Sequence, residues 1–138
     1  MDQSEISRER MFDPLLAVDP SFEPTWSAFV AEWREEGEGE LPIYLALADL
    51  ARHLVGKLEK QDTATFGAVF AIVEDWHLRG DAYVQEAAAI GLLEDLQNTN
   101  LHRGTQPSDF IPWLRPESRR WWDKVERFWS EGALIRDD

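Results

Sequence analysis

The sequence predicts an all-α fold, in which about five main helices pack as a bundle within a single domain. Apolar residues recur at helical spacing in separate segments, and Gly or Pro residues stand between these segments. No Asn-Gly or Asp-Gly pair lies between alternating apolar runs, so no β-hairpin is indicated. A length of 138 residues with 43% hydrophobic residues suffices for one core, and we expect residues 1–138 to form one domain.

Residues 1–20 are expected to hold only short N-terminal turns. Residues 13–18 form an apolar stretch, and Asp19-Pro20 ends it because proline cannot continue a helix. The helical core is therefore expected from residue 22 to residue 132.

The first main helix is expected from Glu23 to Glu36. Ser21 can cap its start and Gly37 stops it. Its apolar residues recur at i, i+3, i+4 and i+7, so they share one buried face. They are Trp26, Phe29, Val30 and Trp33.

A second helix is expected from Pro42 to Glu59, after the linker 37–40. Its apolar residues spread over more than one side, with a main stripe of Leu47, Leu50, Ala51, Leu54 and Leu58. Such a helix contacts neighbours on two faces, so we expect it at the centre of the bundle.

A third helix is expected from Ala64 to Arg79, and a fourth from the N-cap Asp81 to Gln97. The fourth carries small residues, which allow another helix to approach closely. These are Ala87, Ala88 and Gly91. The first and second helices, and the third and fourth, make two pairs of similar length, which is compatible with stacked helical hairpins.

Residues 98–115 are expected to form an apolar loop. They include Asn, Gly and Pro residues that favour turns, but also four large apolar residues, so the loop should fold over the bundle. A last helix is expected from Pro116 to Glu131, stopped by Gly132. Residues 133–138 are expected to form a flexible tail.

The composition restricts the compartment and the partners. The chain has 27 acidic and 14 basic residues, a net charge of −13, which repels nucleic acid and anionic membranes. It contains no cysteine, no apolar span and no export signal near its start. We therefore expect a cytoplasmic protein with no nucleic-acid or membrane partner. Basic proteins are the partners that this charge attracts.

Two spacings can in principle carry chemistry. Glu74 and His77 share a helix face, as in half of a di-metal site, but no second copy of the spacing occurs. His77 can instead lie near the last carbonyl groups of its helix, where a positive charge is favourable. Asp49 and His53 can form an acid–base pair, although no nucleophile motif accompanies them. We expect no catalytic residues, no metal and no cofactor, and hence not an enzyme.

The densest acidic segment lies at the end of the first main helix. It comprises Glu32, Glu35, Glu36, Glu38 and Glu40. Carboxylates at a helix C-terminus oppose the helix dipole and repel one another, so local folding does not favour them. Two interpretations stay open, a docking site for Lys and Arg of a partner and an ordinary solvated linker. Asp75 is a further candidate for partner binding.

Trp121 and Trp122 are adjacent on the last helix and therefore point about 100° apart. Both are buried only if the helix contacts two surfaces. Tryptophan is common at the centres of interfaces, so Trp122 is a candidate partner contact, and packing in the core is the other interpretation.

The segment from Arg79 to Asn98 reads RGDAYVQEAAAIGLLEDLQN. Together with the late Trp-rich helix, it resembles a family of small acidic all-helical bacterial proteins of largely unknown function. The resemblance extends from about Phe22 to Gly132, and it rests on helix caps and packing residues. The family includes candidate immunity proteins, which bind and neutralise a toxin made by the same cell. The resemblance implies this context and transfers no functional residue.

Two functions are therefore expected. The first is an immunity protein that occludes the active site of a basic toxin domain with its acidic surface. The second is a generic protein–protein adaptor or helical scaffold without a toxin partner. The sequence leaves the oligomeric state open.

Overall fold

The computed structural model describes residues 5–36 and 41–132. In this part of the chain all regular elements are helical, and the only β-type contact is an isolated bridge between Ile6 and Gly80. The all-α prediction is therefore confirmed. No helix in these residues is both long enough and apolar enough to cross a membrane.

Seven α-helices are present in the described residues. They are α1 (Phe12–Val18), α2 (Glu23–Glu36), α3 (Ile43–Glu59), α4 (Phe66–Arg79), α5 (Ala82–Glu86), α6 (Glu94–Leu96) and α7 (Pro116–Glu131). A π-helical segment, η2 (Ala87–Leu93), joins α5 to α6, so the predicted fourth helix is one continuous helix with a wider middle. The remaining extra helix, α1, occupies the predicted apolar turn.

Three short 3₁₀ segments complete the fold: η1 (Pro20–Phe22), η3 (Thr99–Leu101) and η4 (Pro107–Trp113). The last two lie within the predicted apolar loop. Phe110 of η4 is fully buried and packs on Phe66 and Phe70 of α4, with ring centroids 5.9 Å away in both cases. The loop therefore folds onto the bundle, as its apolar residues predict.

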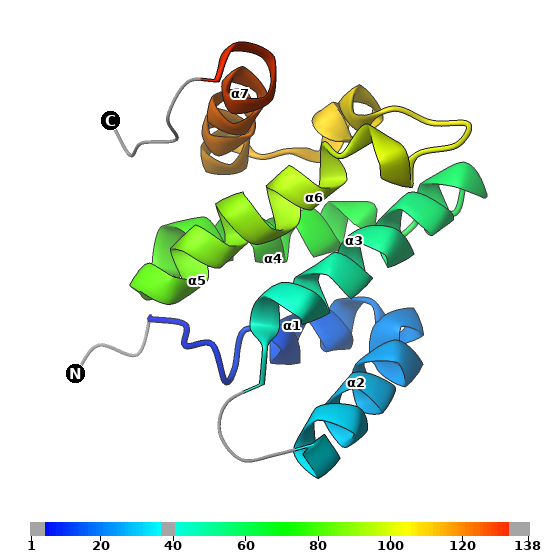
Figure 1. The fold of residues 1–138 in the computed structure, drawn as a ribbon, viewed down its shortest axis with the longest axis vertical. Helices are drawn as coiled ribbons and strands as arrows, with labels where there is room; N and C mark the ends of the chain where they lie inside the picture. The colour runs from blue at the N-terminus through cyan, green and yellow to red at the C-terminus, as the bar shows by residue number, and fades with distance from the viewer. Residues whose placement is uncertain (1–4, 37–40, 133–138) are drawn as a thin grey trace.

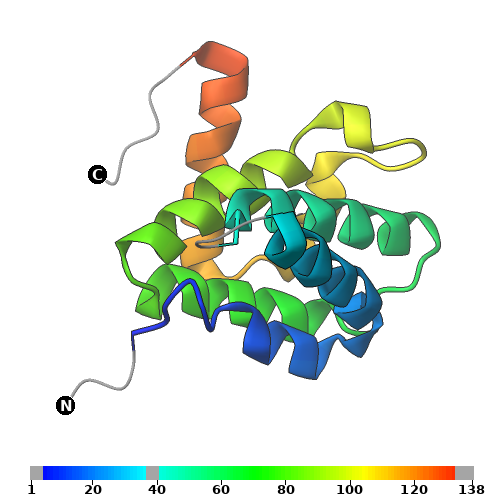
Figure 2. The ribbon, with the colours of Figure 1, turned by 60° about the horizontal axis from the view of Figure 1, so that its bottom comes forward.

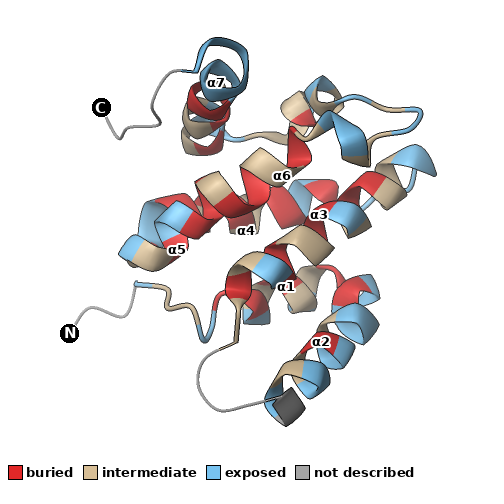
Figure 3. Cartoon of the chain, in the orientation of Figure 1, coloured by how far each residue is buried: buried red, intermediate tan, exposed pale blue. Residues whose placement is uncertain are grey.

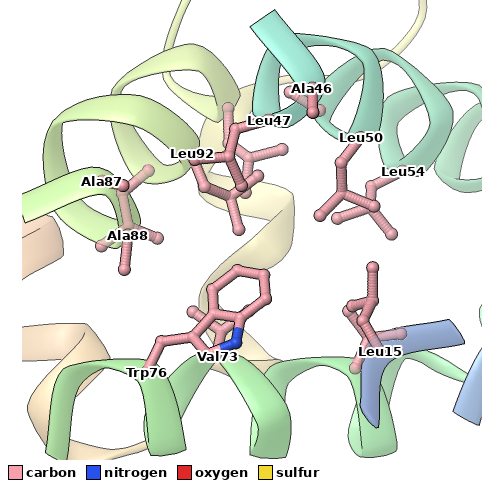
Figure 4. Close-up of a cluster of buried hydrophobic side chains, with 14 of the residues drawn as sticks. Leu15, Ala46, Leu47, Leu50, Leu54, Val73, Trp76, Ala87, Ala88 and Leu92 are labelled. Atoms are coloured by element: carbon pink, nitrogen blue, oxygen red, sulfur yellow. The ribbon is translucent and has the colours of Figure 1, made fainter. Parts of the chain in front are cut away.

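The centre of the molecule is made by α3, α4 and the continuous helix α5–η2–α6, while α7 and α2 lie at opposite ends of the long axis (Figure 1). The close-up in Figure 4 shows side chains of α1, α3, α4 and the continuous helix meeting in one core. Trp76 of α4 is fully buried there, and its indole nitrogen donates to the carbonyl oxygen of Met11 at 3.0 Å. This hydrogen bond ties the start of α1 to the core.

Small residues bring α3 and the continuous helix close together, as expected. Ala87 and Ala88 are fully buried. A Cβ atom at Gly91 would lie 2.9 Å from Cδ1 of Leu47 and 3.4 Å from Cδ2 of Tyr44, so the glycine permits this crossing.

The turn between α4 and α5 depends on Gly80 for space. Its φ of −72° is ordinary, but a Cβ atom there would lie 2.4 Å from the carbonyl oxygen of Trp76. Asp81 then caps α5, because its carboxylate accepts a hydrogen bond from the amide of Val84 at 2.9 Å. The predicted cap at Asp81 is confirmed.

Candidate partner-binding surface

The predicted acidic segment at the end of α2 is described only in part. Glu32 is exposed on α2, which ends at Glu36. The side chains of Glu35 and Glu36 are not described, and Glu38 and Glu40 lie outside the described residues. Docking and simple solvation therefore both remain predictions for this segment.

Asp75 lies partly exposed on α4. Its carboxylate forms an ion pair with Arg79, with Oδ2 3.8 Å from Nη1, one turn along the helix. Both residues line a shallow hollow of about 320 Å³ between α4 and the N-terminal segment around Ile6. This contact gives Asp75 a partner within its own helix.

The position of Trp122 differs from the expectation that it contacts a partner. Its side chain is only 1% exposed, so it belongs to the core and cannot contact a partner in this conformation. The interpretation of Trp122 as core packing is the one the structure supports. Two aromatic residues of α7 do reach the surface, Phe128 at 38% and Trp129 at 52% exposure.

Glu74 has a structural role at the start of α7. Its buried carboxylate accepts hydrogen bonds from the amides of Glu117 and Ser118, at 2.9 and 2.8 Å, and from the hydroxyl of Ser118 at 2.9 Å. These are free amides at the start of α7, where the helix dipole favours a negative charge. Glu74 therefore caps α7 from a neighbouring helix. No group of three or more potential metal ligands occurs among the described residues.

His77 is not the charged helix-end residue that we considered. It is buried, and its ring is nearly parallel to that of Trp121, with centroids 6.4 Å apart. Burial lowers the pKa of His77 to about 4, although the charges of Glu74 and Glu117 act in the opposite direction. The imidazole is therefore neutral at physiological pH.

Asp49 and His53 do not form the pair that their spacing suggests. Asp49 instead forms an ion pair with Arg52. Nε2 of His53 lies 3.4 Å from Oδ2 of Asp19 and 3.1 Å from Oγ of Ser21, both from the segment between α1 and α2. His53 therefore contacts residues that are distant in the sequence, and not Asp49, which lies one turn away on the same helix.

Asp19 is the centre of a polar cluster that ties this segment to α3. It is 1% exposed, and Nζ of Lys57 donates to it at 3.2 Å. Burial alone would raise the pKa of Asp19, but hydrogen bonds from Ser21 and Lys57 outweigh it and lower the pKa. The carboxylate therefore stays charged and paired.

This cluster contains Ser, His and Asp but lacks the geometry of a catalytic triad. In a triad the serine and the carboxylate contact opposite nitrogens of the imidazole. Here Ser21 and Asp19 both lie against Nε2 of His53. Nζ of Lys57 donates to Asp19 at 3.2 Å and to Oγ of Ser21 at 3.1 Å, so it is a hydrogen-bond donor in this cluster. The arrangement ties the segment between α1 and α2 to α3.

A second group of carboxylates lies where α3 meets the continuous helix, and sequence reasoning missed it. We define the acidic face as Asp49, Glu86, Glu94 and Asp95, together with Tyr44. One basic residue, Arg52, lies among them, because it pairs with Asp49 and its charge acts on Asp95. Tyr44 donates its hydroxyl to Glu86 at 3.2 Å, and it lies close enough to Glu94 for that charge to act on it. Leu45, next to Tyr44 on α3, is 50% exposed.

Two carboxyl groups of the acidic face, those of Glu94 and Asp95, are partly buried at an electrostatic cost. Burial, with a further contribution from the charge of Glu94, raises the pKa of Asp95 to about 6, although the charge of Arg52 acts in the opposite direction. Burial also raises the pKa of Glu94. For Tyr44, burial and the charges of Glu86 and Glu94 raise the pKa. A further positive charge brought to this face, beside that of Arg52, would reduce the repulsion between Glu94 and Asp95.

The acidic face could not be found from the sequence, because its members come from two helices 30 or more residues apart. The only available signal was the run of small residues at 87–91, which predicts that another helix approaches there. It does not say which helix approaches or in which register.

Comparison with known proteins identifies a family. Residues 12–130 match the family described as a domain of unknown function, DUF7674. The chain belongs to this family. The DUF7674 match covers α1 through nearly all of α7, which agrees with the expectation of one largely uncharacterised family over the core. No curated protein and no solved structure matched the chain.

Proposed function

We propose that this protein acts by binding another protein, as an immunity protein that neutralises a cognate toxin. The acidic surface would cover the active site of a basic toxin domain. The observation that carries the proposal is the acidic face, where Glu86 and Glu94 lie close to Tyr44 and burial raises the pKa of Glu94 and, to about 6, that of Asp95.

The electrostatics favour such a role. Carboxylates that repel one another gain most when Lys or Arg side chains replace the solvent around them. A net charge of −13 also speeds the encounter with a basic protein at low salt. An acidic surface can therefore compete with a polyanionic substrate for a basic cleft. The predicted segment of Glu32, Glu35, Glu36, Glu38 and Glu40 would add to this attraction.

The toxin is expected to be encoded beside this chain, because an immunity protein must be made together with its toxin. The test is to express that neighbouring gene alone and with this chain in the same cells. We expect growth arrest in the first case and growth in the second, with a stable complex of the two purified proteins. A neighbouring product that is harmless or does not bind would contradict the proposal.

The second candidate is an adaptor or helical scaffold, and the exposed ring of Trp129 is the observation that favours it. An adaptor of this kind would bind mainly through apolar contacts. Because Trp122 is buried, the discriminating variant is Trp129→Ala. If it weakens binding while charge reversal of Glu94 does not, the adaptor function is favoured over toxin neutralisation.

A further inference from the structure

The apolar stripe of α7 continues past the bundle on which the helix packs. Trp122 and Val125 are buried, at 1% and 0% exposure. The next residues on the same helix face are Phe128, three residues after Val125, and Trp129, seven residues after Trp122. These are 38% and 52% exposed. The stripe is therefore longer than the surface that covers it in the described part of the chain.

The exposed end of α7 projects from the molecule. Figure 2 shows the last turns of α7 rising beyond the continuous helix, and Figure 3 shows them exposed. Every residue from 126 to 132 is exposed. The rings of Phe128 and Trp129 contact each other edge to face, with centroids 5.9 Å apart, so the two side chains form one apolar knob.

The base of α7 is held firmly, so the knob is presented in a fixed position. Glu74 caps its first turn with three hydrogen bonds. In the middle of the helix, Gln97 donates its side-chain amide to the carbonyl oxygen of Trp122 at 2.9 Å. At its end, Gly132 adopts the left-handed conformation, with φ of 71°, and stops the helix. A pre-organised contact loses little entropy on binding.

We propose that Phe128 and Trp129 form an anchor that inserts into an apolar pocket of a protein partner whose pocket rim carries Lys and Arg. Charge argues for this occupant. Two of the three charged residues in the exposed stretch 126–132 are acidic, Glu126 and Glu131, and the third is Arg127. The net charge of −13 opposes a second copy of this chain and an anionic membrane at the same site. The inference rests on the proposed function only in taking the partner to be basic.

A defined probe tests the anchor without the natural partner. The full chain, with ¹⁵N-labelled tryptophan, is titrated with a synthetic amphipathic helical peptide of Leu and Lys and, separately, with an all-Lys peptide of equal length. We expect the indole signal of Trp129 to shift with the first peptide, and the all-Lys peptide to bind on the order of tenfold more weakly. Trp129→Ala should weaken binding of the Leu–Lys peptide by a similar factor.

Leu78→Ala is the matched control, because Leu78 is an exposed leucine of α4, at 60% exposure, and does not belong to the stripe. It should change the affinity less than twofold. Equal binding of both peptides, or no effect of Trp129→Ala, would overturn the anchor. So would an indole of Trp129 that is as protected from a soluble paramagnetic agent as that of Trp122, because the site would then already be covered.

The outcomes separate this inference from the proposed function. A harmless neighbouring gene product would remove the toxin but leave the peptide result standing. A failed peptide titration alongside a tight toxin complex would remove only the anchor.

Discussion

Buried polar groups of this protein hold its helices in place. The carboxylate of Glu74 satisfies two amides and a hydroxyl at the start of α7, and Asp19 joins three polar side chains beside α3. Glu74 and His77 have the spacing of metal ligands on the sequence, but their environments give them structural roles. Whether such residues bind a metal or support the fold depends on their burial and on their partners in the folded structure. Neither of these can be deduced from sequence spacing.

Replacing Glu74 should destabilise the protein strongly. Glu74→Ala leaves the amides of Glu117 and Ser118 without their acceptor, at a cost of about 2–3 kcal/mol in the free energy of unfolding. Urea denaturation followed by circular dichroism measures this change. Glu126→Ala, at an exposed site of α7, is the control and should stay within about 0.5 kcal/mol of the parent. Equal effects of the two substitutions would show that Glu74 is not a helix cap.

His77 should make stability depend on pH. Its pKa is lowered to about 4 in the folded protein from 6.5, so the unfolded chain takes up the proton first as the pH falls. The stabilisation is complete above pH 6.5 and is lost as the pH falls through about 4. We expect about 2 kcal/mol to be lost between about pH 7.5 and pH 5. His77→Phe should remove this part of the pH dependence, and an unchanged profile would contradict the assignment.

Asp95 should make the stability change with pH in the direction opposite to that of His77. Its pKa is raised to about 6 from 3.8, so the folded protein binds the proton more tightly and gains stability as the pH falls through about 6 toward 3.8. At pH 7, Asp95→Asn should therefore stabilise the protein, by on the order of 1 kcal/mol once solvent screening is included. Thermal unfolding at pH 7 measures it. A lower melting temperature would mean that the carboxylate is favourable where it stands.

At the scale of elements, periodicity and capping residues predict most of the helices. The bounds 23–36 and 116–131 agree with α2 and α7, because Gly and Pro residues mark their ends. The π-helical segment η2 was not predicted. It lies where small residues pack closely on α3, and such a local widening depends on the neighbouring helix and not on composition.

The two glycines Gly80 and Gly56 should respond oppositely to alanine. At Gly80 a Cβ atom would lie 2.4 Å from a backbone oxygen, which cannot move aside without shifting the turn. We expect Gly80→Ala to cost about 1–3 kcal/mol. Gly56 lies within α3 with no atom within 4 Å of its added Cβ, so Gly56→Ala should stabilise by roughly 0.5–1 kcal/mol. Denaturant midpoints of the two variants test this contrast, and a stabilising Gly80→Ala would refute the close approach.

For the whole molecule, the sequence predicts an acidic binding protein but does not locate the binding surface. Of the carboxylates in the acidic segment singled out on the sequence, from Glu32 to Glu40, only that of Glu32 is described. The acidic face emerges only when α3 crosses the continuous helix. Trp122 and Trp129 share one stripe on the sequence, and only the extent of the bundle decides that the first is buried and the second exposed.

The central claim is that the acidic face guides a basic toxin onto this protein. The most direct test is the association rate constant with the neighbouring gene product, at low and high salt. Glu94→Lys is compared with Glu9→Lys, which makes the same change of charge at an exposed site of the N-terminal segment. We expect Glu94→Lys to slow association on the order of tenfold at low salt and much less at high salt, with a small effect of Glu9→Lys. Equal rates for the two variants would contradict the account.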